Sequence, residues 1–199
     1  MRGAEPGPGQ RRNVGIAMLL LAVAILSSAA DARAQSWSVY GGDAAGTRYS
    51  PATGITKANV AELRVAWTYH TGDAARHGAA FTRSSFEVTP ILAAGKLVFC
   101  TPFDRVIALD ATNGHELWVF DPVLPADLHP ADDAICRGVA VWHDATVAAE
   151  TACADRVFLG TNDARLIALD LGTGKPCAGF GSNGEITLPP DVPPLYRGE

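Results

Sequence analysis

Three polar side chains are of types that could hold a ligand with carboxylate groups, and each stands beside apolar residues. Glu87 lies in the apolar run 86–91, Arg137 directly follows Cys136, and Thr161 ends an apolar segment. Arginine presents a planar, permanently charged fork of donors that matches a carboxylate, and a hydroxyl can donate to one. From the residues alone, Glu87 is typical of a strand glutamate, Arg137 of a surface loop, and Thr161 of a turn cap.

Short strands must position these side chains. Apolar runs bounded by Gly, Asn and Asp predict a four-stranded antiparallel meander over 87–94, 96–101, 104–110 and 115–120. The phrase Arg-Val-Ile-Ala-Leu-Asp at 105–110 returns as Arg-Leu-Ile-Ala-Leu-Asp at 165–170. The meander is therefore expected to recur in part, with strands over 156–161, 165–170 and from residue 175 onward.

Two other segments carry weaker signals. Residues 64–69 alternate between polar and apolar side chains, as a strand does. Residues 121–154, between the two copies, are rich in Pro, Asp and Ala and are expected to form a long loop, which in a regular array is usually functional or disordered.

The repeat predicts an all-β fold. Short strands with a repeated turn suit a sandwich, a barrel or a propeller, and a repeat unit that is one four-stranded sheet favours the propeller. Each blade is apolar on both faces and must stack on neighbours. Two blades cannot close a ring, so we expect about two blades of a larger propeller.

The first 34 residues are expected to be a secretory signal peptide. Arg11 and Arg12 precede an uncharged run over 14–30, and Ala32-Arg33-Ala34 is a small-x-small cleavage pattern. An uncleaved membrane anchor is the alternative, since the run is near the lower length limit for a spanning helix.

Export affects how the four cysteines are interpreted, because disulfides persist outside the cytosol. Four cysteines allow three full pairings, and the sequence does not choose among them. Cys136 and Cys153 bracket a short segment, so we predict a disulfide between them that staples a local loop. Cys100 lies in an apolar strand pattern and also suits a buried small side chain.

The charge balance excludes one class of partner. The whole chain has 16 basic and 21 acidic residues, and without residues 1–34 it keeps 12 and 19, a net charge of −7. No basic run or patch is present, so we expect no nucleic-acid partner.

The turn after the third predicted strand carries a recognisable motif. Residues 108–118 read Ala-Leu-Asp-Ala-Thr-Asn-Gly-His-Glu-Leu-Trp. This A-x-D-x-x-x-G-x-x-x-W pattern resembles the tryptophan-docking motif of the eight-bladed quinoprotein dehydrogenases. Trp118 is then expected to pack on the adjacent blade. In the second copy Ala178 stands in the tryptophan position, and Phe180 is the candidate substitute.

Further segments resemble the same family in order along the chain. Residues 37–51 are similar to the opening of mature quinoprotein alcohol and sugar dehydrogenases, and 86–91 to their first inner strand. Cys136-Arg137-Gly138-Val139 resembles the membrane-associated quinoprotein glucose dehydrogenase branch. We therefore expect residues 35–199 to be the N-terminal part of a quinoprotein β-propeller domain.

The resemblance implies a cofactor, pyrroloquinoline quinone (PQQ), bound with a divalent cation that is usually Ca²⁺. Glu87 and Arg137 match family residues that contact PQQ, and Thr161 stands where a hydroxyl could reach a PQQ carboxylate. The family's general base and its cation ligands belong to later blades. The resemblance thus assigns no catalytic residue and no metal ligand within this chain.

The resemblance also implies a function. It suggests a periplasmic, or membrane-associated, dehydrogenase that oxidises a sugar or polyol, with glucose as the leading substrate. Electrons would pass to a membrane quinone or cytochrome, and the rest of the propeller would be a necessary partner, so we expect this chain alone to be inactive. The alternative is a non-catalytic exported propeller that acts as a scaffold or binding protein.

Overall fold

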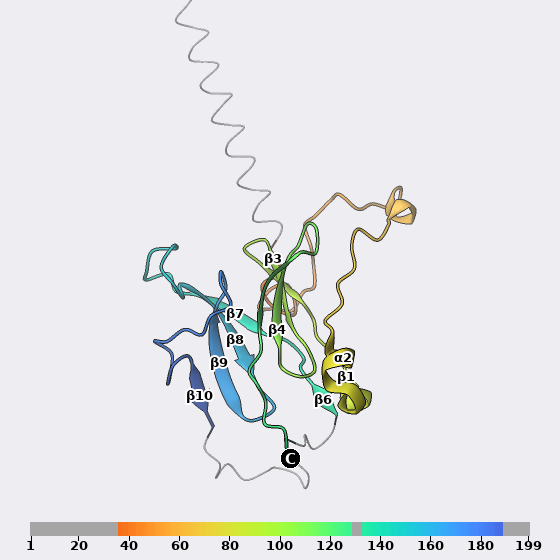
Figure 1. The fold of residues 1–199 in the computed structure, drawn as a ribbon. Coiled ribbons are helices and arrows are strands. Elements are labelled where there is room, and N and C mark those ends of the chain that lie inside the picture. The colour runs from red at the N-terminus through yellow and green to blue at the C-terminus, as the bar shows by residue number, and fades with distance from the viewer. Residues whose placement is uncertain (1–35, 129–132, 189–199) are drawn as a thin grey trace, which may run out of the picture.

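The computed structural model describes residues 36–128 and 133–188. The predicted signal peptide lies outside these residues. Two four-stranded antiparallel sheets stand side by side (Figure 1), with orders β2-β3-β4-β5 and β10-β9-β8-β7. We call them the first sheet and the second sheet. The elements are η1 (Val60–Glu62), α2 (Asp73–His77), η2 (Gly78–Arg83), β1 (Ser84–Ser85), β2 (Ile91–Ala93), β3 (Lys96–Cys100), β4 (Val106–Asp110), β5 (Glu116–Phe120), β6 (Ala134–Ile135), β7 (Ala140–His143), β8 (Asp155–Gly160), β9 (Arg165–Asp170) and β10 (Glu185–Thr187).

The first sheet matches the predicted meander. The strands β3, β4 and β5 fall within the predicted ranges. The inner strand β2 is shorter than predicted and begins only at Ile91. Pro90 has no N–H to give to the ladder, and Thr89 donates its N–H to Arg137 O at 3.4 Å, away from the sheet. The residues before Ile91 are therefore directed to another segment.

The second sheet corrects two expectations. The segment 121–154 is not one loop, because it contains β6 and also β7, which is the inner strand of the second sheet. The outer strand does not start at residue 175. Pro176 makes only an isolated bridge with Leu169, and the strand β10 forms at 185–187. The strand β7 has four residues and β10 has three, and most of these residues are exposed. Their sequences therefore carry little periodic signal.

Both faces of the first sheet are covered. Buried residues of the two sheets form one shared core, which includes Val98, Val106 and Trp118 on one side and Val157 and Ile167 on the other. On the opposite face, Phe99, Ile107 and Leu109 form a second cluster packed against Trp67 and Tyr69. A sheet that is apolar on both faces needs a neighbour on each, so this arrangement supports the propeller prediction.

Trp118 joins the two sheets, as the motif predicts. A Cβ built on Gly174 would lie only 2.5–3.0 Å from three atoms of the Trp118 indole, so the ring rests directly on that glycine. The indole Nε1 donates to Leu171 O at 3.1 Å. Gly174 has φ = 69°, a backbone conformation in which glycine is least strained. Phe180 packs edge-on against Phe158 of its own sheet, and its substitution for a docking tryptophan stays a prediction.

A second tryptophan repeats this contact on the other side of the first sheet. A Cβ on Gly114 would lie 2.5–2.9 Å from three atoms of the Trp67 indole. Nearby, the Tyr69 hydroxyl donates to the Glu116 carboxylate, and burial together with this bond raises the pKa of Tyr69 to about 12. The predicted strand 64–69 forms no ladder within the described residues, although its tryptophan is placed like that of an outer strand.

The disulfides differ from the predicted pairing. Cys100 bonds to Cys136, and Cys153 bonds to Cys177. The predicted Cys136–Cys153 bond is wrong because the two cysteines lie toward opposite ends of β7. Cys136 precedes its first residue, whereas Cys153 stands near its last, His143, which pairs with Asp155, and four extended residues span about 13 Å. Cys100 is indeed fully buried, but in a disulfide.

Hydrogen bonds to a buried carboxylate also link the two sheets. Asp104, in the turn between β3 and β4, accepts hydrogen bonds from the Asn162 backbone N at 2.7 Å and from its Nδ2 at 3.0 Å. Asp104 is 1% exposed. Burial outweighs the Asn162 hydrogen bonds and raises the pKa of Asp104 to about 6.

The Trp118 contact predicts a difference between two glycine substitutions. Gly174→Ala should destabilise the chain by about 1–3 kcal/mol more than Gly95→Ala, because the new methyl group must displace the indole. Gly95 is the matched control: its φ is 73° and a Cβ there would meet nothing within 4 Å. Urea unfolding followed by tryptophan fluorescence measures both values, and equal losses would contradict the docking contact.

The Asp104 environment predicts a pH dependence of stability. The pKa of Asp104 is higher in the folded than in the unfolded state. Its stabilising contribution to the free energy of unfolding is therefore fully present below about pH 4 and is lost as the pH rises past about 6. A shift of about two units corresponds to roughly 3 kcal/mol. Asp104→Asn should flatten this part of the curve of unfolding free energy against pH. An unchanged curve would show that Asp104 titrates normally.

Candidate functional site

The candidate site lies where a short segment crosses the end of the first sheet. We call residues 134–138 the Arg137 arm. It begins with β6, which pairs in parallel with β1 through Ser84–Ala134 and Ser85–Ile135. In Figure 1 this small sheet lies beside α2, away from the β4–β5 turn. The Cys100–Cys136 disulfide then joins the arm to the last residue of β3.

The arm brings together two of the three predicted site residues, Arg137 and Glu87. The Arg137 Nε lies 3.4 Å from Glu87 Oε2, and the two side chains are 77% and 47% exposed. An ion pair this exposed adds little stability, typically 0–1 kcal/mol. The pair is thus poorly explained as a structural element, and both groups are open to a ligand.

Thr161 occupies a different setting. Its hydroxyl donates to Asp163 and accepts from the Arg165 backbone N at 3.0 Å, so it caps the turn between β8 and β9. Burial alone would raise the pKa of Asp163, but hydrogen bonds from Arg165 and Thr161 hold it below its ordinary value. No hydrogen bond joins Thr161 to Glu87 or Arg137 among the described residues, and its role at a cofactor stays a prediction.

Two arginines near this end of the sheets were not among the predicted site residues. Arg105 is buried and donates from Nη1 to Asp73 Oδ1 at 2.7 Å, which ties α2 to the first sheet. Arg165, its counterpart in the repeat, pairs with Asp163 at 2.8 Å and with Glu185 at 3.1 Å. The repeated arginine at the start of each phrase was the available signal. Arg105 thus anchors α2, and Arg165 links the turn between β8 and β9 to β10.

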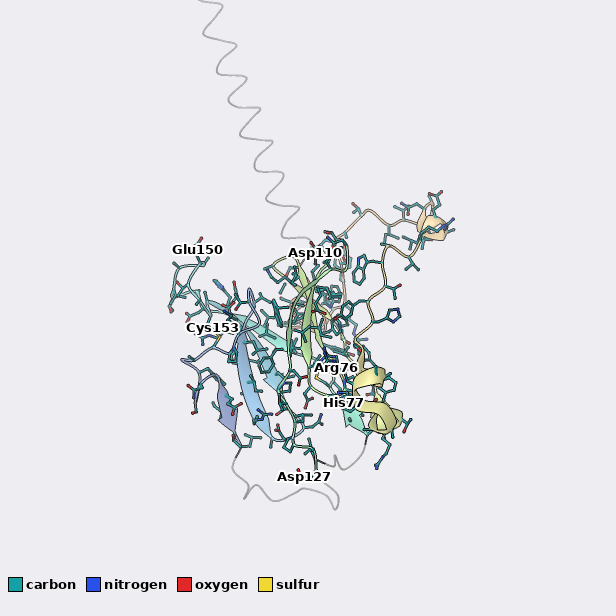
Figure 2. All side chains as sticks on the ribbon, in the orientation of Figure 1. Arg76, His77, Asp110, Asp127, Glu150 and Cys153 are labelled. Carbon is teal, nitrogen blue, oxygen red and sulfur yellow. A yellow bond between two sulfur atoms is a disulfide. The ribbon has the colours of Figure 1, made fainter. Side chains whose placement is uncertain are left out.

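A cavity of about 440 Å³ lies next to the arm. It is lined mainly by apolar side chains, with His77, Arg83, Asp121 and Asn162 as its polar members, and Ala134 of β6 contributes to its wall. Figure 2 shows His77 in the helical segment and Asp127 at the same end of the molecule, opposite Asp110. Glu87 and Arg137 do not line this cavity, so it is separate from their ion pair.

Within residues 36–128 and 133–188, no group of three or more His, Cys, Asp or Glu side chains is arranged to hold a metal ion. Over the same part of the chain, the structure contains no helix whose length and apolarity would let it cross a bilayer.

Comparison with known proteins identifies the family. Residues 37–199 match the PQQ family model, described as glucose/ethanol/alcohol dehydrogenase, beta-propeller domain. The chain is 37% identical over 174 residues to quinoprotein glucose dehydrogenase A of Acinetobacter calcoaceticus, covering 81% of this chain and 21% of that protein. It is 36% identical over 152 residues to the glycerol dehydrogenase large subunit of Gluconobacter oxydans strain 621H, covering 76% and 20%.

Solved structures agree with these relatives. The quinohemoprotein alcohol dehydrogenase from Comamonas testosteroni superposes with a TM-score of 0.56 at 32% identity, covering 71% of this chain and 18% of that one. The chain thus spans about a fifth of the length of the curated relatives it matches. From the family match and the two docked sheets, we conclude that this chain belongs to the PQQ-dependent dehydrogenase family and forms part of its β-propeller.

Proposed function

We propose that this chain is the N-terminal part of a PQQ-dependent dehydrogenase, and that Glu87 and Arg137 belong to the wall of its cofactor site. The observation that carries the proposal is the exposed ion pair at the end of the covalently tethered arm. Bound PQQ would supply the redox chemistry, accepting hydride from an alcohol carbon. This chain would bind and orient the cofactor.

The chemistry of the donors fits such a cofactor. PQQ carries carboxylates, and arginine binds carboxylates through two parallel N–H groups. The contact with Glu87 joins its Oε2 to the Nε of Arg137, and within the described residues no hydrogen bond involves the Nη1 or Nη2 of Arg137. Arg137 would hold a cofactor carboxylate or quinone oxygen with these nitrogens. Glu87 would keep the guanidinium oriented and accept a hydrogen bond from the ligand.

The names of the relatives point to a class of substrate. Several relatives are named for oxidising sugars or polyols, including glucose and glycerol. We therefore propose a sugar or polyol as substrate, with glucose as the leading choice, and a quinone or cytochrome as acceptor. A divalent cation, usually Ca²⁺ in this family, would be held by residues of other blades. The two disulfides support export to an oxidising compartment such as the periplasm.

The rest of the propeller is the partner that this site requires. Trp67 rests on Gly114 as Trp118 rests on Gly174, yet its segment has no strand beside it within the described residues. Val65, two residues earlier, is 83% exposed. We propose that residues 64–69 are the outer strand of another blade, whose remaining strands come from the part of the propeller beyond this chain.

Substitution of the arginine tests the cofactor assignment. In the polypeptide that carries this chain, Arg137→Gln should weaken PQQ binding by about 10- to 100-fold, since a hydrogen bond to a charged group contributes roughly 1.5–3 kcal/mol. The measurement is an absorbance titration with PQQ in the presence of Ca²⁺. Arg156→Gln is the matched control, because Arg156 also pairs with a carboxylate, Asp144, at 3.6 Å but lies in the second sheet. Equal affinity in both variants would refute the assignment.

The activity of the chain by itself is a separate prediction. The purified 199-residue polypeptide, supplied with PQQ and Ca²⁺, should show no PQQ-dependent dye reduction with glucose or glycerol. The physical reason is that only one wall of the site is present, and the family's base and cation ligands belong to later blades. Measurable dye reduction without any added polypeptide would contradict this expectation.

A further inference from the structure

The ion pair at the candidate site is held by few direct contacts. The Arg137 arm pairs with β1 over only two residues. Beyond this short ladder, the Thr89 N–H donates to Arg137 O at 3.4 Å, a long hydrogen bond. The Glu87–Arg137 contact itself is exposed to solvent on both sides. These contacts alone would leave a long, flexible arginine side chain free to sample many positions.

One covalent bond lies directly beside the arginine. Cys136, the residue before Arg137, is 6% exposed and is bonded to Cys100, which is completely buried. Cys100 ends β3, and both cysteines belong to the core shared by the two sheets. The backbone of the arm is thus fastened covalently to the buried core shared by the two sheets, at the residue that precedes Arg137.

We propose that the Cys100–Cys136 disulfide is a positioning device that holds Arg137 beside Glu87, so that the pair is preorganised for the carboxylates of the cofactor. This inference rests on the proposed function for its ligand. Preorganisation raises affinity because the arginine side chain then loses less conformational entropy when the ligand binds. The cysteines would act through Arg137 and would not touch the ligand themselves.

The second disulfide provides a matched control. Cys153 and Cys177 are 24 residues apart in sequence, and Cys100 and Cys136 are 36 apart. Loop closure therefore predicts similar stabilisation from the two bonds. Cys153 follows the turn after β7, whereas Arg137 lies on the arm before that strand. In Figure 2, Cys153 lies toward the end that carries Glu150 and away from Asp127.

The test compares Cys100→Ala/Cys136→Ala with Cys153→Ala/Cys177→Ala in the polypeptide that carries this chain. The first readout is the ¹⁵N NMR signal of the Arg137 Nε–H group with and without Glu87→Gln. We expect Glu87→Gln to move this signal in the unaltered protein and in the control pair, but not in Cys100→Ala/Cys136→Ala. A merely stabilising disulfide would not abolish this coupling in a variant that is still folded.

The second readout is PQQ affinity by absorbance titration. Loss of the Cys100–Cys136 bond should weaken binding about tenfold, with the control pair within about twofold of the unaltered protein. Undiminished coupling and affinity in Cys100→Ala/Cys136→Ala would overturn the positioning role. Failure of the unaltered protein to bind PQQ would overturn the proposed function instead, while the NMR comparison still tests the positioning. Should the alanine pair fail to fold, Cys100→Val/Cys136→Ala retains more of the buried volume and the same outcomes apply.

Discussion

The contact between the Trp118 indole and Gly174 fixes how the two sheets lie against each other. A side chain on that glycine would overlap the ring, and the indole N–H is satisfied by Leu171 O at 3.1 Å. A sheet that is apolar on both faces gains most of its stability from its neighbours. The docking contact therefore does more than add buried area, because it sets the position at which the two apolar faces meet.

The candidate site depends on this arrangement indirectly. Glu87 precedes the inner strand of the first sheet, and Arg137 comes from the connection that leads into the second. Their mutual distance is thus determined by how the two sheets and their connection are held. The ion pair contributes little by itself, since both side chains are exposed. Its geometry is maintained by buried neighbours, chiefly Cys100 and Cys136 in the shared core.

Buried charged side chains also hold the loops at this end of the sheets. Arg105 and Asp73 are both almost fully buried and pair at 2.7 Å, and Asp104 accepts hydrogen bonds from Asn162 of the other sheet. A buried charge is costly unless it is paired or hydrogen-bonded. These contacts therefore require the loops to adopt defined positions. The loops at this end of the sheets are ordered by polar contacts, while the strands are ordered by apolar ones.

The sequence by itself determined the strands of strong periodicity and the repeat, because each depends on local pattern and on residues close together in the chain. The docking role of Trp118 was expected from the resemblance of its motif to that of the quinoprotein dehydrogenases. The sequence did not predict β7 and β10, which are short and mostly exposed and so carry little periodicity. Only the tertiary structure decided that Cys136 bonds to Cys100 and not to Cys153, and that Arg137 reaches Glu87. Those outcomes depend on which segments the packed sheets bring side by side, and spacing along the chain does not encode that directly.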